Sequence, residues 1–147
     1  MTKEELFDFL SRELLEYRQE DIKIGNCKIR GTNLGLENHN IMSLDLHLEG
    51  DGFGVSFGGY RMDGAYGMAC LRELLETLEV GKYEDLKGMY VRCVNTGFGG
   101  RCLAIGHLLK DRWFSFGAFF NAHKECGDRE NGVEASTEMG DKSSDGR

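Results

Sequence analysis

The stretch Gly50-Asp51-Gly52-Phe53-Gly54-Val55-Ser56-Phe57-Gly58-Gly59-Tyr60-Arg61 decides how the neighbouring segments can fold. Phe53, Val55 and Phe57 alternate with small residues, which is the period of a β-strand with one buried face. Glycine weakens a strand unless another backbone or a ligand has to approach closely. A second segment of the same character, Asn95-Thr96-Gly97-Phe98-Gly99-Gly100-Arg101, follows later. The two segments indicate either a pair of tight hairpin turns or the frame of a site for a flat, anionic small molecule.

The periodicities on either side of this stretch predict an α+β domain with a mainly antiparallel sheet, on which an N-terminal helix and one central helix pack. We expect a first helix from Thr2 to about Gln19, which begins with a capping box formed by Thr2 and Glu5, and a second helix from Ala65 to Val80, which Gly81 ends. Strands are expected over 22–29, 44–48 and 53–61 between the two helices, and over 89–94 and 102–109 after the second. A short turn at 83–86 precedes the last two strands, and the loop 97–101 joins them. The aromatic segment 113–120 is expected in the core or in an oligomer interface.

The length of 147 residues suits a single folded domain, and the charge of −7 is unevenly placed. Residues 1–20, the amphipathic helix, carry three basic and six acidic side chains, and residues 122–147 carry four and seven. The second segment is polar and has no periodicity, so we expect an acidic, disordered tail there. Residues 21–121 then form the single ligand-binding domain.

Basic side chains gather in the later part of this domain. Residues 88–121 contain Arg92, Arg101, Lys110 and Arg112 against one acid, Asp111. This pattern fits a discrete anion site better than a nucleic-acid interface, which needs a broad basic face. Four scattered, solvated cations fit the same pattern, and only the structure can separate the two interpretations.

The cysteine pattern indicates reduced, buried thiols in a cytosol. The five cysteines form no CxxC pair and have no histidine partners at zinc spacing. No apolar run approaches the length of about 20 residues that a membrane span requires. Asp45, His47 and Glu49 share one face of a strand and could bind a metal, but a solvated face explains them as well. We therefore expect no metal and no cofactor.

A catalytic interpretation of Ser56 is the main alternative to a binding site. The run Gly54-Val55-Ser56-Phe57-Gly58 matches the G-x-S-x-G pattern of hydrolases. That motif works where a strand turns sharply into a helix, whereas here a second pair of glycines follows. No spacing links His107 or His123 to the serine. The sequence therefore predicts no catalytic centre.

The remaining candidates carry binding chemistry. Arginines supply planar donors for phosphate oxygens, aromatic rings beside glycine can stack on a base, and an asparagine can donate to and accept from a base edge. Backbone amides of paired glycines can form an anion-binding nest. The candidate ligand-binding residues are Gly59, Tyr60, Arg61, Asn95, Phe98, Arg101 and Arg112.

Five segments together resemble the phage anti-Thoeris sponge proteins, over roughly 24–116. They are Ile29-Arg30-Gly31-Thr32-Asn33-Leu34-Gly35-Leu36-Glu37-Asn38-His39, the stretch from Gly54 to Tyr60, Ala65-Tyr66-Gly67-Met68, Tyr83-Glu84-Asp85-Leu86-Lys87-Gly88, and Ala104-Ile105-Gly106-His107 with Lys110-Asp111-Arg112-Trp113-Phe114. The long N-terminal helix and the acidic tail have no counterpart in that family pattern.

The resemblance implies a non-enzymatic protein that sequesters the cyclic ADP-ribose isomer made by a bacterial Thoeris TIR enzyme, and so blocks that defence. It also implies a homo-oligomer, a dimer or larger, in the cytosol of the infected bacterium, with cyclic oligonucleotides as ligands of a second kind of site in some members. On this chain, Asn95 and Phe98 would lie at the nucleotide site near a dimer interface, and Arg61 and Arg112 would contact phosphate.

Two rival hypotheses use the same residues differently. The first is an enzyme that cleaves such a nucleotide, with His107 as its acid–base group. The second is an inhibitor that binds a protein through its acidic ends. Recovery of intact ligand separates the first rival from the sponge, and deletion of 124–147 separates the second.

Overall fold

The computed structural model describes residues 2–10, 22–37, 39–96 and 101–131, and the structural statements below refer to these. Helix α1 (Lys3–Phe9) begins as the sequence predicts, because Thr2 Oγ1 accepts a hydrogen bond from the Glu5 amide and Glu5 Oε1 accepts one from the Thr2 amide. The predicted continuation of this helix over 11–19 lies outside the described residues.

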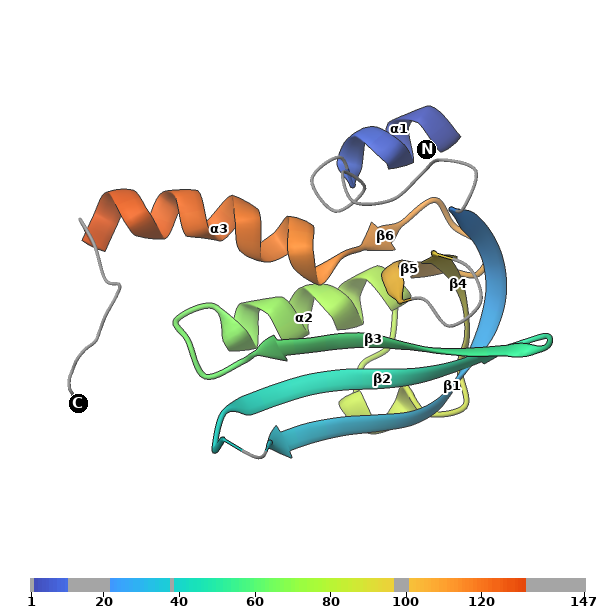
Figure 1. Cartoon of the computed structure of the whole chain (residues 1–147), viewed down its shortest axis with the longest axis horizontal. Coiled ribbons are helices and arrows are strands. Elements are labelled where there is room, and N and C mark those ends of the chain that lie inside the picture. Colours follow the sequence, from blue (N-terminus) through green and yellow to red (C-terminus); the bar gives the residue numbers. More distant parts are fainter. Residues whose placement is uncertain (1, 11–21, 38, 97–100, 132–147) are drawn as a thin grey trace.

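A curled, antiparallel sheet with the strand order β3-β2-β1-β4-β5-β6 forms the body of the protein (Figure 1). The predicted α+β class, with an N-terminal and a central helix, is confirmed. The strands are β1 (Lys23–Leu36), β2 (Met42–Gly50), β3 (Phe53–Arg61), β4 (Tyr90–Asn95), β5 (Cys102–His107) and β6 (Trp113–Phe114); the other helices are α2 (Gly67–Leu78), the 3₁₀ turn η3 (Tyr83–Asp85) and α3 (Phe116–Asn131).

Strand β1 bends and belongs to both halves of the sheet. Lys23–Lys28 pair with β4, whereas Lys28–Leu36 pair with β2. A register shift between Ile29 and Gly31 marks a bulge at Arg30, and bulges bend the strand that carries them. The strand is therefore longer than the predicted 22–29, and Figure 1 shows it curving from β4 round to β2.

Aromatic side chains close the concave side of the sheet. Phe57 of β3 lies 6.2 Å from Phe114 of β6 and 4.8 Å from Phe116 of α3, measured between ring centroids. All three are almost fully buried, as is Leu74 on the inward side of α2. The aromatic segment 113–120 thus supplies the core, one of the two places expected for it.

The convex side of the sheet is covered over one half only. Leu6 and Leu10 in the α1 segment pack with Val94, Leu103 and Ala104 of β4 and β5, on the face opposite to the main core. In the described part of the chain, no helix covers the convex face of the β1–β2–β3 half. That open face carries the candidate site.

Two helix boundaries differ from the sequence prediction. Helix α2 ends at Leu78 and not at the predicted Val80, because Glu79 adopts the left-handed conformation with φ 58°. Helix α3 continues to Asn131, through the first ten residues of the predicted tail, and residues 132–147 lie outside the described residues. None of the described helices is long and apolar enough to cross a membrane.

Candidate functional site

Two adjoining hollows lie on the open face, and we call them together the outer groove. The first, of about 550 Å³, is lined by Arg30, His47, Leu48, Glu49, Gly54, Val55 and Ser56. The second, of about 320 Å³, is lined by Asn26, Cys27, Lys28, Arg30, Glu49, Gly50, Asp51 and Tyr90. Because Arg30 and Glu49 line both hollows, these two residues mark the middle of the groove.

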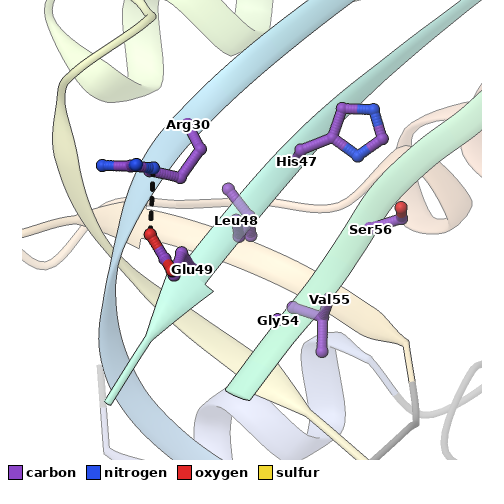
Figure 2. A pocket seen from close by; sticks show the side chains of 7 residues that line it. All are labelled: Arg30, His47, Leu48, Glu49, Gly54, Val55 and Ser56. Atoms are coloured by element: carbon purple, nitrogen blue, oxygen red, sulfur yellow. Dashed lines mark ion pairs between the residues drawn. The ribbon is translucent and has the colours of Figure 1, made fainter. Parts of the chain in front are cut away.

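Arg30 reaches the groove because of the bulge in β1. The bulge leaves Arg30 outside the regular pairing of β1 with β2. Its Nε lies 2.9 Å from Oε1 of Glu49, and both side chains are more than half exposed. Figure 2 shows the two side chains facing each other above the strands. The groove thus holds a planar, solvent-accessible guanidinium, the group best suited to phosphate or carboxylate oxygens.

Two glycines leave the base of the groove free of side chains. Gly54 of β3 pairs with Glu49, and Gly31 of β1 pairs with His47. A side chain at either position would rise beside its cross-strand neighbour, because paired residues of an antiparallel sheet share a face. Gly54 therefore leaves space beside Glu49, while Asp51 and Gly52 of the same stretch form the tight turn between β2 and β3, as the hairpin interpretation predicts.

The second hollow adds an aromatic surface and opposing charges. Tyr90 is 56% exposed, and the Nζ of Lys28 lies 5.6 Å from the centre of its ring. Lys28 pairs across the strands with Glu49, and Asp51 lines the same hollow. The groove is thus charge-balanced, with cations and carboxylates side by side, and offers a ring on which a base or sugar could stack.

A serine, a histidine and an aspartate lie in one row beside the first hollow. Ser56 of β3 pairs directly with His47 of β2, so both project from the open face. Nε2 of His47 lies 3.7 Å from Oδ1 of Asp45, a buried oxygen that has no hydrogen-bond partner in the described residues. The sequence offered only His107 and His123 as partners for Ser56, because His47 comes to lie opposite the serine only through the strand register.

Three predicted ligand-binding residues lie at the end of β3, away from the outer groove. Gly59 has φ 84° and forms a bulge opposite β2. The Tyr60 ring stacks on Phe116 and Phe120, with centroid distances of 5.3 and 5.8 Å, so it anchors α3. Arg61 is exposed, with its Nε 2.6 Å from Asp63. The ring predicted as a platform for a base is therefore partly buried and already stacked on two phenylalanines.

The second glycine-rich segment does not form a shared site with the first in the described residues. Asn95 ends β4, is 7% exposed, and its amide lies 3.8 Å from the Sγ of Cys93. Arg101 is exposed, and its backbone amide donates to Thr96 Oγ1. Phe98 lies outside the described residues. The described members of the set do not line the outer groove.

Arg112 is held by the left-handed residue that ends α2. Its Nη1 lies 2.8 Å from Oε2 of Glu79, and Nζ of Lys110 lies 2.8 Å from the same oxygen. Arg61 precedes α2 and Arg112 contacts its end, so the length of a 12-residue helix, about 18 Å, lies between the two arginines. The two predicted phosphate contacts therefore cannot bind one phosphate together in this conformation.

This cluster makes the protein's stability depend on pH. Hydrogen bonds from Lys110 and then Arg112 hold the pKa of Glu79 below its ordinary value of 4.5. A depressed folded-state pKa stabilises the fold above the unfolded-state pKa, and this contribution is lost as the pH falls through the folded-state value. We expect Glu79→Gln to lower the Tm at pH 7, with a difference from the natural protein that shrinks toward pH 3. Glu76→Gln, on the same helix, serves as the control. A difference independent of pH would contradict the assignment.

The thiols form a buried group under the sheet. Cys27, Cys70, Cys93 and Cys102 are free and buried, as predicted. Hydrogen bonds from Cys102 and Cys27 lower the pKa of Cys93, whereas the bond to Cys93, followed by burial, raises that of Cys27. Cys27 and Cys93 are diagonal neighbours on the paired strands β1 and β4, and both are free thiols. No group of three metal-binding side chains occurs in the described part of the chain.

Comparison with family models, curated proteins and solved structures finds no match for this chain. The likeness to the anti-Thoeris sponge proteins therefore stays a prediction from the five sequence segments.

Proposed function

We propose that the protein is a phage-encoded sponge that binds a cyclic nucleotide immune signal reversibly and leaves it intact. The signal is a cyclic ADP-ribose isomer, with cyclic oligonucleotides as a further ligand class, and its capture blocks a Thoeris-type defence. The sponge acts in the cytosol of the infected bacterium, as a homo-oligomer and without a cofactor. The specific ligand rests on the resemblance of the five segments.

The outer groove supports the binding part of this proposal. One observation carries it: two hollows on an uncovered sheet face share an exposed arginine, Arg30, whose partner is an equally exposed carboxylate. Exposed ion pairs are weak, so a ligand phosphate can take the guanidinium at little cost. Tyr90 offers an aromatic surface nearby. This groove replaces Arg61 and Arg112 as our proposed phosphate site, because those two arginines lie apart.

Replacing Arg30 with alanine tests the site. A charge-assisted hydrogen bond contributes about 1.5–3 kcal/mol, so Arg30→Ala should weaken binding about 10- to 150-fold. The measurement is calorimetric titration with the cyclic ADP-ribose isomers. Arg72→Ala is the matched control, because Arg72 pairs with Glu76 on α2 and does not line the groove. Absence of binding to the natural protein would overturn the proposal.

The row of Ser56, His47 and Asp45 favours one alternative, hydrolysis of the ligand. In that reaction His47 would take the proton from Ser56 as the serine oxygen attacks a ligand phosphorus atom. The bond from phosphorus to the leaving oxygen would break, His47 would return the proton to that oxygen, and water would then hydrolyse the phosphoserine. His47 is 62% exposed at its side chain, so water has free access to the row. To test for hydrolysis, the ligand bound to the protein is released by heat and analysed by chromatography. Altered ligand, with cleavage lost in Ser56→Ala, would establish the enzyme in place of the sponge.

A further inference from the structure

The ion pair in the middle of the outer groove combines donors and acceptors at one place. Arg30 offers only N–H donors, and ionised Glu49 offers only acceptor oxygens. Oε1 of Glu49 lies 2.9 Å from Nε of Arg30, and each residue lines both hollows. A ligand that binds in the groove must therefore offer acceptors to Arg30 and donors to Glu49. A ligand that offers only one kind of group leaves the other residue without a hydrogen bond from the ligand.

A ligand with phosphate alone fits this pair poorly. Its oxygens can accept from Arg30, but they repel Glu49, and Asp51 adds a second carboxylate in the second hollow. A ligand whose sugar carries both a phosphate and free hydroxyl groups fits better, because the hydroxyls can donate to the carboxylate while the phosphate accepts from the guanidinium. Adjacent hydroxyls on a sugar ring present two donors to one carboxylate.

We propose that Glu49 is the specificity-determining residue of the outer groove and selects sugar phosphates that carry two adjacent free hydroxyls on the sugar. This inference rests on the proposed anion site over Arg30 and adds the class of ligand that the site prefers. In the bound state Arg30 contacts the phosphate, Glu49 accepts from the sugar hydroxyls, and Tyr90 lies beside the ring attached to the sugar.

The experiment compares three probes by calorimetric titration: AMP, 2′,3′-dideoxy-AMP and inorganic pyrophosphate. The natural protein should bind AMP about tenfold more tightly than dideoxy-AMP, the effect of a hydrogen bond to a charged group. In Glu49→Ala this preference should fall to less than about threefold, while pyrophosphate binding should strengthen about threefold because a repelling charge is gone. Glu76→Ala, which alters an exposed carboxylate on α2, should change none of these values.

The outcomes separate this inference from the proposed function. Equal binding of AMP and dideoxy-AMP by the natural protein, lost in Arg30→Ala, would overturn the role of Glu49 and keep the anion site. A Glu49→Ala variant that binds all three probes more tightly would make Glu49 a competitor of the ligand and overturn its selecting role. Binding of the cyclic isomer without binding of AMP or pyrophosphate would also overturn the inference alone. If the natural protein binds neither the probes nor the isomers, both proposals fail.

Discussion

Replacing Phe57 with alanine is expected to lower the free energy of unfolding by about 3–5 kcal/mol, the usual range for a buried phenylalanine. Phe57 is 1% exposed and contacts Phe114 and Phe116 at centroid distances of 6.2 and 4.8 Å. These contacts join β3, at one edge of the sheet, to β6, at the other edge. The truncation therefore removes apolar area and also weakens the closure of the curled sheet.

The loss is measured by urea unfolding, followed by circular dichroism, and by the shift in Tm, which should be about 10 °C for a chain of this size. Phe57→Leu keeps most of the buried volume and should cost clearly less. Leu109→Ala removes a side chain that is 86% exposed and should change stability by less than about 0.5 kcal/mol. A similar loss in Leu109→Ala and Phe57→Ala would show that Phe57 does not close the core.

The architecture could be predicted because the buried pattern is local. Val55 and Phe57 face the core and Ser56 faces out, as strict alternation requires. The capping box of Thr2 and Glu5 spans only four residues, so the start of α1 could be predicted in the same way. Each of these signals depends on residues close in sequence, and each predicted element has a counterpart in the structure.

The outer groove could not be predicted, because strand register creates it. Arg30 meets Glu49 only because β1 bulges after Ile29, and His47 meets Ser56 only because β2 and β3 pair in one particular register. A one-residue change of register would move each of these side chains to the opposite face. One signal for the bulge was present: Gly31 interrupts an apolar alternation, which is typical of a bulge.

The positions of the predicted arginines could not be derived from the sequence, for a related reason. A sequence shows an arginine but not the carboxylate that pairs with it, and the partner of Arg112 is Glu79, 33 residues earlier. Glu79 itself occupies a left-handed position at the end of α2 that glycine usually takes, so the sequence pattern favoured Gly81 as the stop. Contacts across long sequence separations thus decide where each of these cations lies.

Replacing Gly58 with alanine should cost about 3 kcal/mol, because two separate penalties act at this residue. Its φ of 119° lies in the region that L side chains rarely adopt. A Cβ atom there would also lie 2.5 Å from the Leu44 carbonyl oxygen and 2.9 Å from the Cα of Asp45. The pairing of Gly58 with Asp45, next to the bulge at Gly59, would have to open, and Asp45 would move relative to His47.

Two other glycines separate the penalties. Gly59 has φ 84°, but no atom lies within 4 Å of the place that a Cβ atom would occupy, so Gly59→Ala should show the backbone strain alone, about 1 kcal/mol. Gly35 has neither a positive φ nor a close neighbour, so Gly35→Ala should be neutral or slightly stabilising. Urea unfolding of the three variants should give the order Gly58, Gly59, Gly35. Equal losses in Gly58→Ala and Gly59→Ala would mean that β2 moves away from the new Cβ atom at little cost. The strands β2 and β3, which carry part of the outer groove, would then be easily deformed.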